Sequence, residues 1–303
     1  MNKLLITLLS LSLSASIHAQ SLKNSIEGSD IWGAWLVKGT SKVWLVDEIP
    51  ERARLWDYEN NEVVVSFKMK ENVKSINLLD NGSLAYITHH EKNEYIILNE
   101  SGNTTVKKIK NNAPYYYIHP GGKYAFGSIF EGFVTYTIGE KKISESKLND
   151  SITDYTSRFY QTGSPEVIFR RSNDVFQKID IYSDGVLAVS RAYDKGLLLF
   201  DESKNHFLLV SPKSYTSYSL TELQSKTTFD RSTSIDLYNA LYNSEDQTIW
   251  YCKDGSINRF DLKIEKDTNS VFLDVGDLYF EDRMGNTAIG FSNKKQKFFV
   301  IEL

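Results

Sequence analysis

Short runs of Val, Ile, Phe, Tyr and Thr alternate with Gly, Asn, Asp, Ser and Lys along most of the chain. After the first twenty residues, no segment sustains the three- and four-residue apolar spacing of an amphipathic helix. Residues 134–138 alternate between apolar and polar side chains, which is typical of a half-buried strand. Residues 95–98 form a continuous apolar run, which suits a strand covered on both faces. The pattern therefore predicts an all-β fold.

A tight turn between two apolar runs recurs at nearly even steps, between 39 and 43 residues apart. The marker residues of these turns are Gly39, Gly82, Gly122, Gly163, Lys204, Asp246 and Gly285. A step near forty residues that contains four short strands is typical of a β-propeller blade. We therefore predict a β-propeller of seven four-stranded blades.

A different choice of marker keeps a six-bladed ring as the alternative. The segment around Gly185 also resembles the unit around Gly82. As a marker, Gly185 would lie 63 residues after Gly122 and 61 residues before Asp246. The seven-blade interpretation has the more even step, and the six-blade interpretation requires longer loops.

The two ends of the chain are predicted to share one blade. Residues 297–302 form an apolar run that is the third of its unit, so this unit lacks a fourth strand. Residues 21–29 are available to supply it. Pairing of these segments would close the ring and cover an open strand edge.

The first nineteen residues have the features of a cleaved secretory signal. Lys3 gives a positive start, residues 4–17 are apolar and Ser-rich, and Ala19 precedes Gln20. We expect a signal peptide over residues 1–19 and a single β-propeller domain over residues 20–303. Charges interrupt every later apolar run, so no transmembrane span is expected. The mature chain is expected to be exported, either periplasmic or secreted.

Composition narrows the class further. The chain has 303 residues, of which 41% are hydrophobic and 13% aromatic, and it contains one cysteine. These values exclude a disordered chain, a disulfide-stapled mini-domain and a multi-cysteine metal site. Without Lys3, 34 basic residues oppose 39 acidic ones, a net charge of −5. No basic block is present, so a nucleic-acid partner is not expected.

Three short motifs resemble the bacterial secreted β-propellers of the WD40-like and YVTN-like superfamily. The motifs are the turns Asp80-Asn81-Gly82 and Pro120-Gly121-Gly122, similar to a Ser-Pro-Asp-Gly turn, and the dipeptide Trp56-Asp57. The resemblance covers roughly residues 30–303 and implies the architecture. It assigns no functional residue, because propellers serve both as binding modules and as enzymes.

Common catalytic motifs are absent from the sequence. It has no G-x-S-x-G elbow, no phosphate-binding glycine loop and no H-E-x-x-H motif. Cys252 ends the apolar run 249–252, which indicates a buried, unreactive thiol. No cofactor or metal site is assigned, because the histidines are scattered and the adjacent pair points to opposite faces of a strand. The histidines considered are His89, His90, His119 and His206.

Several acidic and aromatic residues stay open as candidates. Acids that flank predicted strands, and that serve most often as turn caps, are Asp47, Asp154, Glu166, Asp230, Asp236 and Asp277. Most aromatic rings are expected to fill the wedges between blades, with Tyr115, Tyr116 and Tyr160 as candidate ligand platforms. The polar stretches 147–157 and 214–234 are candidate functional loops.

The sequence favours an exported β-propeller that acts as a protein- or ligand-binding module without a recognisable catalytic site. Its expected partner is another protein or an envelope polymer, and the sequence does not indicate an oligomeric state. The alternative is a hydrolase or lyase acting on a sugar or lactone. That alternative requires acids or histidines from three or more blades to converge at the channel mouth.

Overall fold

All regular secondary structure in the described part of the chain is β-strand, as the sequence pattern predicts. The computed structural model describes residues 21–89, 92–110, 113, 115–129, 132–140, 142–149, 158–162, 167–172, 175–180, 186–191, 196–230, 237 and 240–303. Within these ranges, no helix has the length and apolar character needed to span a membrane.

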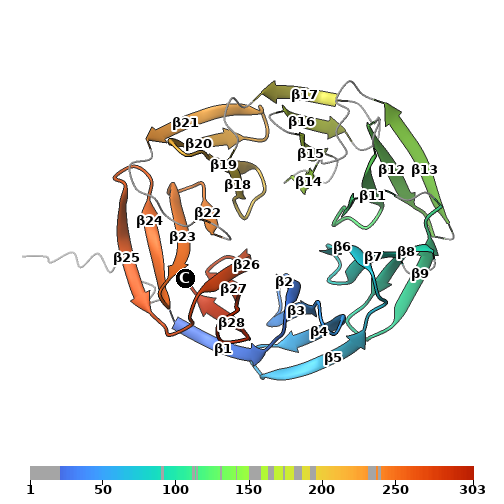
Figure 1. Cartoon of the computed structure of the whole chain (residues 1–303), viewed down its shortest axis with the longest axis horizontal. Helices are drawn as coiled ribbons and strands as arrows, with labels where there is room; N and C mark the ends of the chain where they lie inside the picture. Colours follow the sequence, from blue (N-terminus) through green and yellow to red (C-terminus); the bar gives the residue numbers. More distant parts are fainter. Residues whose placement is uncertain are drawn as a thin grey trace, which may run out of the picture.

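The described strands form seven four-stranded antiparallel sheets, set radially around a central axis (Figure 1). Listed from the innermost strand outwards, sheet 1 is β2 (Ile31–Leu36), β3 (Lys42–Asp47), β4 (Arg52–Asp57) and β5 (Glu62–Lys68); sheet 2 is β6 (Val73–Leu78), β7 (Leu84–His89), β8 (Asn93–Leu98) and β9 (Thr104–Lys108); sheet 3 is β10 (Tyr115–Ile118), β11 (Tyr124–Ile129), β12 (Gly132–Ile138) and β13 (Ile143–Asn149). Sheet 4 is β14 (Arg158–Gln161), β15 (Val167–Ser172), β16 (Val175–Asp180) and β17 (Val186–Arg191); sheet 5 is β18 (Leu197–Phe200), β19 (His206–Val210), β20 (Ser214–Ser219) and β21 (Gln224–Asp230). Sheet 6 is β22 (Leu241–Asn243), β23 (Thr248–Lys253), β24 (Ser256–Asp261) and β25 (Lys266–Phe272); sheet 7 is β26 (Leu278–Met284), β27 (Thr287–Ser292), β28 (Lys297–Glu302) and β1 (Ser21–Glu27).

The recurring turn found in the sequence is the connection between the first and second strands of each sheet. All seven marker positions lie between such strands, although Gly163 itself is outside the described residues. Positive φ values occur at Gly39 (74°), Gly82 (81°), Gly122 (71°), Lys204 (55°), Gln247 (60°) and Gly285 (57°). Gly185, also outside the described residues, falls between β16 and β17, the third and fourth strands of sheet 4. It therefore does not mark the beginning of a sheet.

The predicted pairing of the chain ends is confirmed. Strand β1 runs antiparallel to β28, with Ser21 opposite Glu302 and Glu27 opposite Lys297. The Lys297 ammonium lies 3.0 Å from the Glu27 carboxylate in an exposed ion pair. The N-terminal strand thus becomes the outermost strand of the sheet that the C-terminal segment begins, as Figure 1 shows.

Aromatic rings fill the spaces between neighbouring sheets, as predicted. Trp44 of β3 is fully buried in a cluster with Leu84 and Tyr86 of sheet 2. Its indole N–H donates to the Gly82 carbonyl at 2.9 Å, so the ring also fixes the turn of the next sheet. The half-buried pattern expected for residues 134–138 is wrong, since only Thr137 is exposed. Both faces of this strand are covered because each sheet packs between two others.

Candidate functional site at one end of the central channel

The turns that follow the innermost strands share one end of the ring. Each sheet repeats the same antiparallel order, so every innermost strand runs in the same direction along the axis. The turns between third and fourth strands reach the same end. We call this end the inner-turn face. It brings together short segments that are about forty residues apart in the sequence.

A cavity of about 740 Å³ opens at the inner-turn face. Its wall contains residues from six of the seven sheets and their turns, including Lys38, Asp80, Pro120, Thr162, Glu202 and Glu281. The Trp35 ring of β2 also lines it. The size lies within the range of ordinary ligand pockets. A site assembled from so many sheets requires the closed ring for its geometry.

Two adjacent carboxyl groups at the end of β26 are set into this wall. The Asp282 carboxylate accepts hydrogen bonds from the backbone N–H groups of Leu36 (2.9 Å) and Arg283 (2.8 Å). Burial nevertheless raises the pKa of Asp282 above its ordinary value. Burial, together with the neighbouring Asp282 charge, raises the pKa of Glu281 to about 8. Glu281 is therefore a carboxyl group that holds its proton near neutral pH.

Other acids of the cavity hold the wall together. Glu100 pairs with the Lys42 ammonium at 2.8 Å, which joins the turn of sheet 2 to sheet 1. Glu202 accepts a hydrogen bond from the Gly285 N–H at 2.9 Å, which joins sheet 5 to sheet 7 across the cavity. Acids from three sheets thus line one cavity. Within the described ranges, however, no three His, Cys, Asp or Glu side chains lie close enough together to hold a metal ion.

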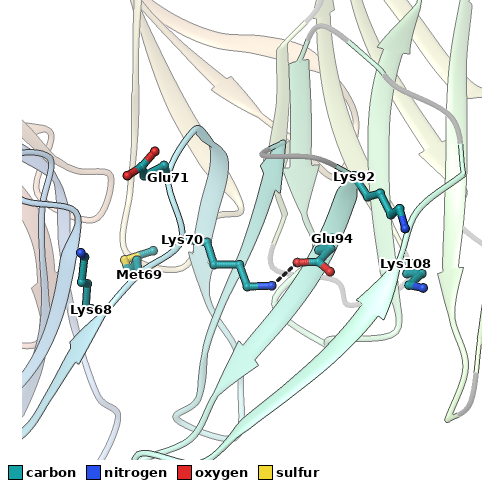
Figure 2. A pocket seen from close by; sticks show the side chains of 7 residues that line it. All are labelled: Lys68, Met69, Lys70, Glu71, Lys92, Glu94 and Lys108. Carbon is teal, nitrogen blue, oxygen red and sulfur yellow. Dashed lines mark hydrogen bonds and ion pairs between the residues drawn. The ribbon is translucent and has the colours of Figure 1, made fainter.

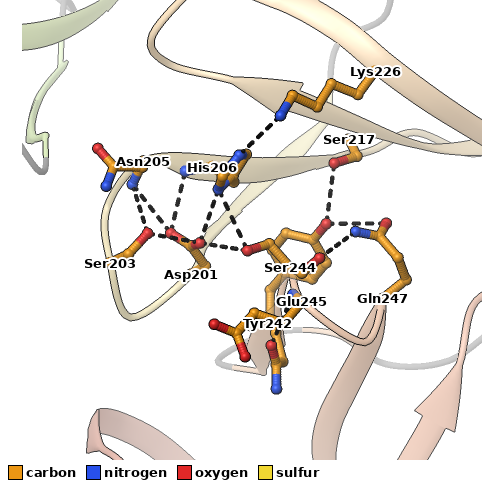
Figure 3. Close-up of polar contacts among 11 residues, drawn as sticks. Asp201, Ser203, Asn205, His206, Ser217, Lys226, Tyr242, Ser244, Glu245 and Gln247 are labelled. Carbon is orange, nitrogen blue, oxygen red and sulfur yellow. Dashed lines mark hydrogen bonds and ion pairs between the residues drawn. The ribbon is translucent and has the colours of Figure 1, made fainter.

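A second polar cluster joins sheets 5 and 6 at the same face (Figure 3). His206 Nδ1 lies 3.2 Å from Asp201 Oδ2 and 3.4 Å from Ser244 Oγ, and Ser244 donates to the same Asp201 oxygen at 2.6 Å. A nucleophile–base–acid triad needs the serine and the acid on opposite nitrogens of the imidazole. Here both contact Nδ1, and Nε2 faces the Lys226 ammonium at 3.2 Å. The cluster is a structural tie between sheets.

The remaining histidines lie apart. His119 is buried, its Nδ1 accepts the Gly121 N–H at 3.1 Å, and burial lowers its pKa although the Asp80 charge opposes that shift. His89 lies at the end of β7, with Nδ1 2.5 Å from the Asn93 side-chain oxygen. His90 lies outside the described residues.

The acids singled out in the sequence are not those of the cavity. Asp47 is completely buried and pairs with Arg52 and Arg54, each at 2.9 Å. Asp230, at the end of the outer strand β21, and Asp277, before β26, are exposed and do not line the cavity. Asp154, Glu166 and Asp236 lie outside the described residues.

Most of the other sequence candidates belong to the packed interior. Tyr116 packs in the core of sheets 2 and 3, and the Tyr160 ring stacks on Phe200 at 4.9 Å, so neither is a ligand platform. The side chain of Tyr115 is outside the described part. Cys252 is partly buried, its thiol contacts the Gly276 carbonyl at 3.2 Å, and burial raises its pKa.

The polar stretch 214–234 is mostly strand, because β20 and β21 occupy residues 214–219 and 224–230. The other polar stretch, 147–157, includes the end of β13, and its residues 150–157 lie outside the described ranges. The expectation of a functional loop over residues 214–230 is therefore wrong, since these residues pair in sheet 5.

Sequence reasoning missed Asp80, Glu202, Glu281 and Asp282 as members of one cavity. One signal was available, because all four lie within four residues of a marker turn. Their meeting depends on the common direction of the innermost strands, which the repeat alone does not specify.

Comparison with known proteins identifies the architecture. No protein-family model and no curated protein sequence matches this chain. Its structure is similar to the β-propeller domain of Cps50 (Swd1) from Myceliophteria thermophila, with a TM-score of 0.66 and 10% sequence identity over 94% of this chain and 99% of that one. At this identity the similarity concerns the fold alone. The predicted resemblance to WD40-like β-propellers is therefore confirmed as a resemblance of architecture.

Proposed function

We propose that this chain is an exported, seven-bladed β-propeller that acts as a binding module. Its ligand, part of a protein or of an envelope polymer, enters the cavity at the inner-turn face. The observation that carries this proposal is the cavity of about 740 Å³ walled by residues from six sheets. Pockets of this kind, formed where several elements converge, are the usual sites of ligand binding.

Binding is favoured over catalysis because most cavity acids are engaged in holding the wall. Glu100, Glu202 and Asp282 each bond to a group from another sheet. A catalytic pair of carboxylates would need both groups free to face a substrate. Lys38 and Asp80, both exposed at the rim, are better suited to contact a polar ligand.

The second candidate function is a sugar- or lactone-directed hydrolase or lyase. It is supported by Glu281, whose pKa of about 8 suits a general acid at neutral pH. An enzyme of this kind would release product from a chromogenic glycoside or lactone, and Glu281→Gln would abolish that release. Absence of turnover with a broad glycoside and lactone panel would leave the binding module as the function.

Export is part of the proposal and has its own test. Residues 1–19 carry the pattern of a signal peptide. The intact mass of the protein recovered from a bacterial envelope fraction is expected to correspond to a chain that begins at Gln20. A protein retained inside the cell with residues 1–19 attached would contradict export.

The cavity is tested by affinity capture from the envelope fraction. The double variant Lys38→Glu/Asp80→Lys reverses two rim charges and is expected to lose the partner that the unaltered protein retains. A matched control, Lys253→Glu/Asp277→Lys, changes the same residue types at exposed positions outside the cavity. Equal capture by both variants would refute the cavity as the binding site.

A further inference from the structure

A second pocket, separate from the channel, lies at the opposite end of the ring between sheets 1 and 2. Its volume is about 460 Å³, and it is lined by Lys68, Met69, Lys70, Glu71, Lys92, Glu94 and Lys108 (Figure 2). Lys68 ends β5 and Lys108 ends β9, so the outer strands of two neighbouring sheets contribute to it. We call this pocket the lysine groove.

The charge of the lysine groove is opposite to that of the whole chain. Its lining contains four lysines and two glutamates, a net charge of +2, whereas the chain carries −4. Lys70 is neutralised by Glu94, with 2.5 Å between ammonium and carboxylate. Among the described residues, Lys68, Lys92 and Lys108 form no ion pair within 4.0 Å and are exposed. Like charges gathered around one hollow repel one another, and an anion placed there relieves this repulsion.

The groove offers charge and little else. It contains no aromatic ring, and its single apolar side chain, Met69, is only 3% exposed. Protein partners usually need a buried aromatic or aliphatic anchor, and single-stranded nucleic acids need rings on which bases stack. Lysine ammonium groups act as hydrated point charges without the bidentate geometry of arginine. These features suit a hydrated, linear polyanion whose charges repeat along the chain.

We propose that the lysine groove binds an acidic polysaccharide through its carboxylate or sulfate groups. The choice of polysaccharide rests on the proposed function, because an exported protein meets envelope polymers. The groove and the channel cavity lie at opposite ends of the ring and share no lining residue. Polymer held at the groove leaves the inner-turn face open for a second partner.

The test measures binding of the purified mature protein to oligogalacturonate, which carries carboxylates, and to heparin fragments, which carry sulfates. The triple variant Lys68→Glu/Lys92→Glu/Lys108→Glu is expected to weaken binding at least tenfold. Binding by the unaltered protein is expected to fall steeply as salt rises. The control Lys253→Glu/Lys263→Glu/Lys266→Glu reverses three exposed lysines of sheet 6 and should bind as the unaltered protein does.

Two further probes decide between classes of partner. Preferential binding of polyglutamate or of a single-stranded oligonucleotide would overturn the polysaccharide assignment. Equal glycan binding by the groove variant and the control would overturn the groove itself. The cavity variant Lys38→Glu/Asp80→Lys should keep glycan binding. Failure of the groove therefore appears in this assay, while failure of the proposed function appears in the capture and export experiments.

Discussion

At the scale of single residues, buried charge in this protein serves mainly to join sheets. Asp47 accepts hydrogen bonds from Arg52 and Arg54, and Arg54 also donates to the Glu27 carbonyl of the N-terminal strand at 2.8 Å. Asp47 and Arg54 are 0% and 6% exposed. A strand-flanking acid that the sequence leaves open as catalytic is therefore a structural tie between sheets 1 and 7.

Replacing Asp47 with Ala leaves the Arg54 guanidinium buried without its counter-ion. Loss of one partner of a buried pair costs about 3–5 kcal/mol, so a decrease of that size in the free energy of unfolding is expected. Asp274→Ala breaks the exposed pair with Lys295 and should cost less than about 1 kcal/mol. Denaturant titration of both variants measures the difference, and similar values would contradict this role of Asp47.

Glu281 predicts a pH dependence of stability. Its pKa is about 8 in the folded protein and near 4.5 ordinarily, so between these values the folded state binds more protons than the unfolded state. This group therefore makes stability fall as pH rises through that window. Glu281→Gln removes this contribution, and its melting temperature should exceed that of the unaltered protein by at least about 2 °C at pH 8.5 and by less at pH 5. An identical pH profile for both proteins would contradict the raised pKa.

At the scale of elements, the turn between first and second strands is the feature that the sequence predicts best. Glycine is favoured where φ is positive, and it occupies four of the six such turns with described markers. The other two turns place Lys204 and Gln247 in this conformation, so a search for glycine alone misses them. There the even spacing supplied the prediction.

Gly39 and Gly82 have similar φ values but different surroundings. A Cβ at Gly82 would lie 2.7 Å from Glu100 Oε1 and 3.3 Å from Val37, whereas a Cβ at Gly39 would meet nothing within 4 Å. Gly39→Ala should therefore cost about 1 kcal/mol for backbone strain alone, and Gly82→Ala should cost more. Equal unfolding free energies in the two variants would show that the neighbours of Gly82 adjust freely.

The N-terminal strand closes the last sheet, so its removal should affect the whole ring. Without residues 21–30, the ladder of β28 loses its partner and an open strand edge is exposed. We expect a sharp decrease in melting temperature relative to a chain that begins at Ser21. An unchanged melting temperature would show that the pairing contributes nothing to stability.

The fold was more predictable than the site for a physical reason. Strands and turns depend on nearby residues, so the repeat revealed them and the place of Trp56-Asp57 at the end of β4. The cavity depends on which ends of distant strands meet. Asp80 and Glu202 are 122 positions apart in the sequence and line one wall only because their sheets share a direction.

At the scale of the whole molecule, the two ends of the ring differ in chemistry. The inner-turn face carries a cavity rich in acids, and the opposite end carries the lysine groove. Two chemically distinct sites on one rigid ring are suited to bridging two different partners. This arrangement agrees with a binding module more simply than with an enzyme, which needs one site only.

The central claim is that the inner-turn cavity holds the partner, and affinity capture from the envelope fraction tests it most directly. The unaltered protein and Lys253→Glu/Asp277→Lys are predicted to retain the same partner, and Lys38→Glu/Asp80→Lys is predicted to lose it while keeping its melting temperature. Retention of that partner by the folded cavity variant would contradict the account.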